Sequence, residues 1–121
     1  MNTICKAVII HCSDHRIQPA LNNWLDKQDL LGSVDRISIG AAVKEHNHEI
    51  VLENLKLSTL SNTIEEVILV QHRDCGAYHG DESQLLNDIQ SLTHKIKSHL
   101  PNASVTALLI EPVWAVREIQ L

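Results

Sequence analysis

The sequence has few aromatic residues and no long apolar segment. Among its 121 residues there is no Phe, one Tyr and two Trp, and no uninterrupted apolar run exceeds four residues. A membrane-spanning helix needs about 20 consecutive apolar residues, so we expect no membrane partner. The beginning of the chain has too short an apolar stretch and no small-residue cleavage site, which is not typical of a secretion signal.

The sequence also has no excess of basic residues, and its number of cysteines is odd. Ten Lys and Arg oppose fifteen Asp and Glu, and the net charge of −5 argues against a nucleic-acid partner. Three cysteines do not complete a disulfide framework, so we expect free thiols in a reducing compartment, the cytoplasm. Each cysteine is then a buried apolar side chain, a reactive thiol or a metal ligand.

Apolar residues are nevertheless sufficient for one core. The hydrophobic fraction is 44%, and we expect a single domain over residues 1–121. Apolar patterning predicts strands over 3–11, 35–43, 66–71 and 104–110 and helices over 17–31, 47–60 and 83–100. The tail from Glu111 fits either an edge strand or a short docking segment. Alternating strands and helices predict a three-layer α/β fold with a mainly parallel sheet of four or five strands.

Potential metal ligands follow two of the predicted strands. The motif CSDHR (residues 12–16) comes after the first strand, and HRDCG (residues 72–76) comes after the third. Ligands of such sheets bind at the carboxyl ends of strands, so Cys12, His72 and Cys75 converge if these two strands are neighbours. Two thiolates and one imidazole suit Zn²⁺, and three protein ligands leave a fourth position open, as in catalytic zinc sites.

Taken together, the two motifs closely resemble the signature of the β-class carbonic anhydrases. That family carries C-x-D-x-R after its first core strand and H-x-x-C-G after its third, and the resemblance covers the whole core. It implies one Zn²⁺ per chain held by Cys12, His72 and Cys75, a core strand order of 2-1-3-4, and a homodimer or higher homo-oligomer. The implied activity is the reversible hydration of carbon dioxide to bicarbonate by a zinc-bound hydroxide.

The resemblance also assigns roles to Asp14, Arg16 and Gly76. Asp14 corresponds to the family's catalytic aspartate, which accepts a hydrogen bond from the hydroxide, and an ionised carboxylate is acceptor-only. Arg16 corresponds to the catalytic arginine that holds this carboxylate and keeps it ionised. Without Arg16, Asp14 would be free to close the fourth metal position. Gly76 falls where the family binds substrate.

Less specific interpretations exist for several of these residues. Cys12 also fits a buried filler, although a phosphatase loop is excluded because only three residues separate it from Arg16. His72 and Cys75 also fit a structural pair, and Asp14 a helix cap. The remaining cysteine, Cys5, is expected to pack in the core. The histidines beside the motifs are candidate proton relays: His15 and His79.

Other parts of the family pattern do not match. The family's Arg-Asn-Ala-Gly stretch after the second strand is replaced around residues 38–42, and we expect no counterpart of the helices that precede the first strand. The first hypothesis is therefore a zinc lyase acting on carbon dioxide or bicarbonate. The alternatives are a carbonic anhydrase-like zinc protein with weak or no such activity, and a relative that hydrolyses another small electrophile such as CS₂.

Overall fold

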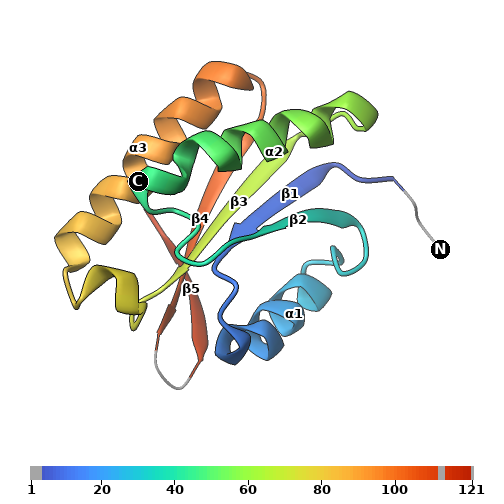
Figure 1. The fold of residues 1–121 in the computed structure, drawn as a ribbon. Helices are drawn as coiled ribbons and strands as arrows, with labels where there is room; N and C mark the ends of the chain where they lie inside the picture. Colours follow the sequence, from blue (N-terminus) through green and yellow to red (C-terminus); the bar gives the residue numbers. More distant parts are fainter. Residues whose placement is uncertain (1–3, 112–113, 121) are drawn as a thin grey trace.

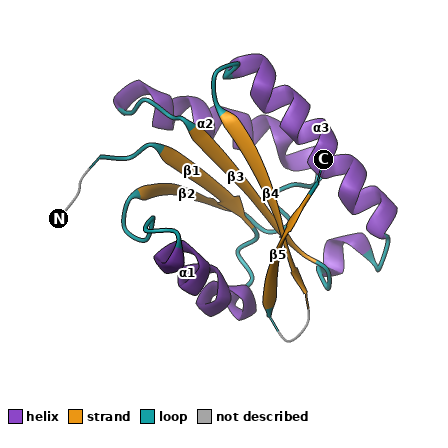
Figure 2. Cartoon of the chain, turned by 180° about the vertical axis from the view of Figure 1, so that it is seen from behind, coloured by secondary structure: helices purple, strands orange, loops and turns teal. Residues whose placement is uncertain are grey.

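A mainly parallel sheet between two layers of helices forms the centre of the molecule. The computed structural model describes residues 4–111 and 114–120. Figure 1 shows α2 and α3 on one face of the sheet and α1 on the other, and Figure 2 shows the same layers from behind. The predicted three-layer α/β class is therefore confirmed. Within the described ranges, no helix combines the length and the hydropathy that a bilayer crossing requires.

The elements follow one another in the alternating order that the sequence predicts. Three short 3₁₀ turns, η1, η2 and η3, follow the strands β1, β2 and β3 in the chain. The complete order is β1 (Ala7–His11), η1 (His15–Ile17), α1 (Gln18–Lys27), β2 (Val34–Ser38), η2 (Glu45–Asn47), α2 (His48–Ser61), β3 (Glu66–His72), η3 (Gly76–Tyr78), α3 (Glu82–His99), β4 (Ser104–Glu111) and β5 (Ala115–Ile119).

The sheet has the strand order β2-β1-β3-β4-β5, so the core order 2-1-3-4 is confirmed. The strands β2, β1, β3 and β4 run parallel, and β5 pairs antiparallel with β4. The tail after Glu111 is therefore an edge strand that returns along β4. Residues 112–113, between these two strands, lie outside the described part of the chain.

The central strands are buried on both faces, which explains their unbroken apolar runs. All five residues of β1 are buried, and β3 is buried from Val67 to His72. The helix α3 contributes one apolar stripe to this core, formed by Leu85, Ile89, Leu92 and Ile96. The Asp81 side chain caps this helix by accepting a hydrogen bond from the backbone N–H of Gln84.

Two predicted elements end earlier than expected. The predicted strand over 35–43 is wrong beyond Ser38, where β2 ends. The chain then turns back toward β1: Ala41 has a φ of 52°, and its N–H donates to the Cys12 sulfur.

The predicted helix over 17–31 is wrong beyond Lys27, because Asp29 takes a left-handed φ of 59°. The strand expected from residue 3 begins at Ala7, and residues 1–3 lie outside the described part.

Side-by-side pairing of β1 and β3 determines where the functional residues lie. These strands pair in parallel from Ala7↔Glu66 to Ile10↔Leu69. Their carboxyl ends therefore reach the same edge of the sheet, where the chain continues into Cys12 on one strand and into the turn after His72 on the other. The two motifs, sixty residues apart in sequence, thus become neighbours.

Truncating the core of the central strand should destabilise the whole domain. Ile68, in β3, is fully buried, and Ile68→Ala removes its packing and leaves a cavity. We expect a loss of about 2–5 kcal/mol in the free energy of unfolding, measured by urea denaturation. Leu60→Ala is the control, because Leu60 is 81% exposed and should change stability by less than about 0.5 kcal/mol. Equal effects of the two substitutions would contradict the described core.

Candidate metal centre

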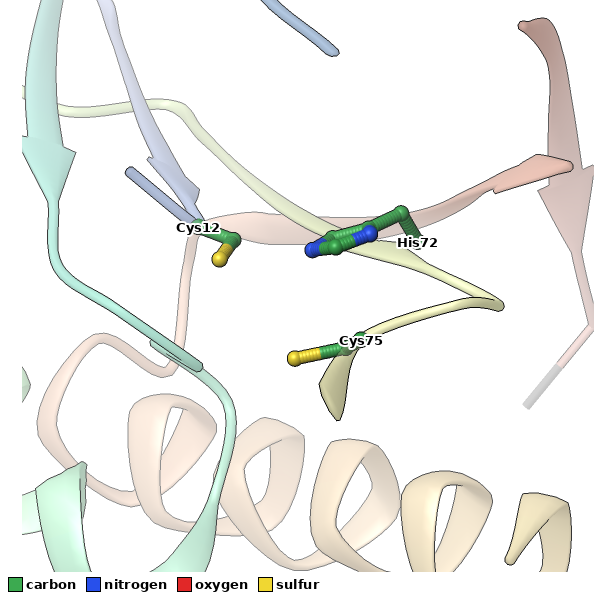
Figure 3. A group of neighbouring side chains, drawn as sticks. All are labelled: Cys12, His72 and Cys75. Carbon is green, nitrogen blue, oxygen red and sulfur yellow. The ribbon is translucent and has the colours of Figure 1, made fainter. Parts of the chain in front are cut away.

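Three potential metal ligands meet at the carboxyl ends of β1 and β3. Cys12 directly follows β1, His72 is the last residue of β3, and Cys75 lies in the turn that leads to η3. All three are buried, and their ligand atoms lie within 4.8 Å of one another. Figure 3 shows the His72 imidazole pointing toward the sulfur atoms of Cys12 and Cys75. This group of side chains could hold a metal ion.

The orientation of His72 leaves one ring nitrogen for a ligand. Its Nδ1 lies 2.7 Å from Asp74 Oδ1. Because an ionised carboxylate only accepts hydrogen bonds, Nδ1 carries a proton, and Nε2 keeps its lone pair when the imidazole is neutral. Nε2 is buried and has no hydrogen-bond partner among the described residues. A buried polar atom without a partner is costly, and a metal ion bound between the sulfurs would satisfy it.

The environment of Cys12 favours its thiolate. Burial raises the pKa of this thiol, but the protonated form of the His72 imidazole and the backbone N–H groups of Ala41 and Asp14 outweigh burial and lower the pKa to about 7. The Ala41 N–H lies 3.3 Å from the sulfur. The early end of β2 therefore has a direct chemical consequence, because the turn that replaces the expected strand presents a donor to Cys12.

The second cysteine differs from the first. Burial raises the pKa of Cys75, and the nearby Cys12 sulfur also favours its neutral form. A metal ion deprotonates a coordinating thiol outright, so Cys75 becomes a thiolate when a cation binds. Cys12 is therefore readily a thiolate near neutral pH without a metal, whereas Cys75 becomes a thiolate only when a cation binds.

Asp14 and Arg16 lie together beside the three potential ligands. The Arg16 guanidinium donates to both oxygens of Asp14, with Nη2 at 2.6 Å from Oδ2 and Nε at 3.1 Å from each oxygen. The backbone N–H of Arg16 also donates to Oδ1, so Asp14 caps η1 as well. Chiefly because of the Arg16 side chain, the pKa of Asp14 lies well below its usual range. Asp14 Oδ2 lies 3.9 Å from His72 Nε2.

A pocket of about 610 Å³ opens above these residues. Its walls include His15, Gly40, His46 and Gly76, and none of the described residues that line it is Phe, Tyr, Trp or a branched aliphatic. A Cβ placed on Gly76 would meet nothing within 4 Å, so this residue leaves free space beside the potential ligands. The other candidate relay, His79, is exposed at the end of η3 and is not a lining residue.

Buried polar contacts hold the turn that carries Cys75. Tyr78 donates to the buried carboxylate of Asp88 at 2.7 Å, and Gln84 donates to its other oxygen at 2.8 Å. The Lys44 ammonium donates to the backbone carbonyl of Ala77 at 2.7 Å and lies over the Tyr78 ring. The turn is thereby fastened to α3 on one side and to the loop after β2 on the other.

Comparison with known proteins identifies the family. A family model described as "Putative carbonic anhydrase" matches residues 2–120. The chain belongs to this carbonic anhydrase family. A solved structure, the β-carbonic anhydrase isoform I of the protozoan Trichomonas vaginalis, matches with a TM-score of 0.60 and 17% sequence identity over 98% of this chain and 85% of that chain. At this identity the match supports the β-carbonic anhydrase fold. No curated protein matches at a significant level.

Sequence reasoning located the three potential ligands of this carbonic anhydrase family member but missed some of their neighbours. His46 lines the pocket, but it lies outside both sequence motifs, so the sequence did not indicate a place in the site. Only the fold brings η2, which contains His46, to this edge of the sheet. Trp114 lies with its ring 5.7 Å from the Arg16 guanidinium, which depends on the return of β5. Asp74 was visible as an acidic residue two positions after His72, a spacing that allows a side chain to reach back to the ring.

The thiol of Cys12 should react at lower pH than an ordinary cysteine. In the metal-free protein, we expect its alkylation by iodoacetamide to rise with a midpoint near pH 7, because only the thiolate reacts and its pKa is about 7. The burial of Cys75 should move its reaction to higher pH. Peptide mass spectrometry after timed labelling measures both rates.

Added Zn²⁺ should suppress the labelling of Cys12 and Cys75. Cys5 serves as the internal control, since it precedes β1 at the opposite end of that strand and should react equally with and without the metal. A Cys12 midpoint near pH 9, or equal labelling of all three cysteines in the presence of zinc, would contradict the described site.

Proposed function

We propose that this protein binds one Zn²⁺ per chain through Cys12, His72 and Cys75 and catalyses the reversible hydration of carbon dioxide to bicarbonate. One observation carries the proposal. The carboxylate of Asp14, whose Oδ2 lies 3.9 Å from the His72 Nε2 that faces the metal position, is engaged by Arg16 through three side-chain contacts. At 3.9 Å from Nε2, Asp14 is too far away to orient this ligand by a hydrogen bond, so metal binding alone does not explain its placement. A catalytic site, in contrast, needs an open position and an oriented acceptor next to it.

The donor set supports zinc as the metal. Two thiolates and one imidazole are soft to borderline ligands, which favour Zn²⁺ over Mg²⁺ or Ca²⁺. The unpartnered Nε2 of His72 and the low pKa of Cys12 both suit a cation between them. When bound, zinc lowers the pKa of a coordinated water from 15.7 to about 7 and so supplies hydroxide at neutral pH.

Asp14 has the task of orienting the attacking oxygen. As an ionised carboxylate it accepts a hydrogen bond from that oxygen and leaves the oxygen lone pair directed at the carbon of carbon dioxide. Arg16 keeps Asp14 ionised and holds it away from the fourth metal position. Gly76 leaves space on the pocket wall, which suits a small linear substrate.

Hydration of carbon dioxide releases one proton for each bicarbonate, and this proton must leave the pocket. His15 Nδ1 lies 3.8 Å from Asp14 Oδ1, and its side chain is 94% exposed. We assign His15 the transfer of the proton from the pocket to solvent, because imidazole is a common proton carrier at neutral pH. His46 lines the same pocket and is also exposed, which gives a second route.

The proposed enzyme works as a homodimer or a larger homo-oligomer. In the described sheet, β2 and β5 are edge strands, and each leaves backbone groups available for pairing. The helix α2 also exposes Ile50, Leu57 and Leu60, with exposed fractions of 49%, 62% and 81%. Exposed apolar side chains and open sheet edges are both features that association between copies would cover.

Stopped-flow measurement of carbon dioxide hydration by the zinc-loaded protein tests the activity. We expect a rate well above that of free zinc, rising from about pH 7 to about pH 9, because two thiolates leave the metal site formally neutral and less electrophilic than a three-histidine site. Asp14→Ala should retain zinc, since the three ligands remain, but lose about 10- to 100-fold in activity.

Asp26→Ala is the matched control, because it removes an exposed carboxylate on α1 outside the pocket and should leave the rate unchanged. A wild-type rate equal to that of free zinc, or equal to that of Cys12→Ala, would contradict the enzymatic proposal. Stoichiometric zinc in such an inactive protein would instead favour a zinc-binding protein of this family without carbon dioxide activity.

A further inference from the structure

We propose that Asp74 is a positioning residue that couples the metal-binding histidine to the Asp14–Arg16 pair. Its two carboxylate oxygens have different partners. Oδ1 lies 2.7 Å from His72 Nδ1, and Oδ2 lies 3.1 Å from Arg16 Nη1. The carboxylate thus bridges the two motifs, since His72 belongs to the second and Arg16 to the first. This inference rests on the proposed metal binding and does not depend on the reaction.

The contact through Oδ1 determines which nitrogen of His72 faces the metal position. A neutral imidazole carries its proton on either ring nitrogen, and the hydrogen bond of one nitrogen decides the state of the other. Asp74 accepts from Nδ1, so the proton is held there and Nε2 remains a lone-pair donor. Hydrogen bonds of this kind also fix the ring orientation, and their loss typically costs about 10- to 100-fold in metal affinity.

The contact through Oδ2 determines the position of Arg16. The guanidinium uses Nε and Nη2 for Asp14 and Nη1 for Asp74. Each carboxylate therefore takes a different edge of the planar fork, and together they fix its direction. The Arg16 side chain is 43% exposed, so few other contacts limit its movement apart from the Trp114 ring on one face.

These contacts form a chain of side chains, here called the circuit, that begins at one nitrogen of His72 and ends near the other. From His72 Nδ1 it runs through Asp74, Arg16 and Asp14, and it returns to within 3.9 Å of His72 Nε2. Removing Asp74 opens the circuit at two points. His72 loses the acceptor that selects its tautomer. Arg16 loses one of the two carboxylates that fix its direction, and it therefore holds Asp14 away from the fourth metal position less firmly.

Competition with a chromophoric chelator measures the zinc affinity of the wild type, Asp74→Ala and Asp74→Asn. We expect Asp74→Ala to bind zinc about 10- to 100-fold more weakly. The Asn side chain has nearly the same volume as Asp, but its single oxygen can accept from only one of the two donors, His72 Nδ1 and Arg16 Nη1. The zinc affinity of Asp74→Asn should therefore lie between those of the wild type and Asp74→Ala. Asp26→Ala is the control for loss of one negative charge and should match the wild type.

The tautomer of His72 provides a readout that a general structural role would not move. In the metal-free protein at alkaline pH, where the imidazole is neutral, ¹⁵N NMR should place the proton on Nδ1 in the wild type and divide it between both nitrogens in Asp74→Ala. Circular dichroism checks that each variant is folded, and Asp74→Asn decides the question if the Ala variant does not fold.

Two results would overturn the inference. One is a zinc affinity of Asp74→Ala, or of Asp74→Asn where Ala does not fold, within about twofold of the wild type. The other is an unchanged His72 tautomer in Asp74→Ala. Neither readout needs turnover of carbon dioxide, and a wild type that binds no zinc would instead contradict the metal proposal itself.

Discussion

Parallel pairing of β1 with β3 is the constraint on which the rest of the site depends. The register from Ala7↔Glu66 to Ile10↔Leu69 brings the carboxyl ends of both strands to one edge of the sheet, and each chain segment then continues directly into its motif. Because both strands are buried on both faces, a shift in register would cost much of the core. The spacing between the potential ligands is therefore determined by the most stable part of the domain rather than by flexible loops.

The state of each potential ligand is determined by its hydrogen-bond partners. The turn after β2 presents the Ala41 N–H to Cys12, and Asp74 holds the proton of His72 on Nδ1. Burial would otherwise favour the neutral thiol of Cys12, as it does for Cys75. Local donors and acceptors thus favour the metal-binding forms of two of the three side chains, while the Arg16 guanidinium binds the carboxylate of Asp14 beside them.

Sequence reasoning succeeded where the signal was local and failed where it depended on tertiary contacts. The strands β1 and β3 and the helix α3 lie close to where the apolar pattern predicts them, and the fold class and core order are confirmed. The early end of β2 was not predictable from residues 35–43, because the turn is stabilised by a sulfur 29 residues away. The same holds for His46, which only the fold brings to the pocket. The functional roles of Asp14, Arg16 and Gly76 remain predictions.

X-ray absorption at the zinc edge of the loaded wild-type protein tests the central claim most directly, because it counts the atoms around the metal. The account predicts two sulfur atoms at about 2.3 Å and two nitrogen or oxygen atoms at about 2.0–2.1 Å, the second of them from a ligand other than the three side chains. The same spectrum should persist in Asp14→Ala if Arg16 holds Asp14 off the metal. A shell with one sulfur or none, or a shell that loses its fourth atom in Asp14→Ala, would contradict the account.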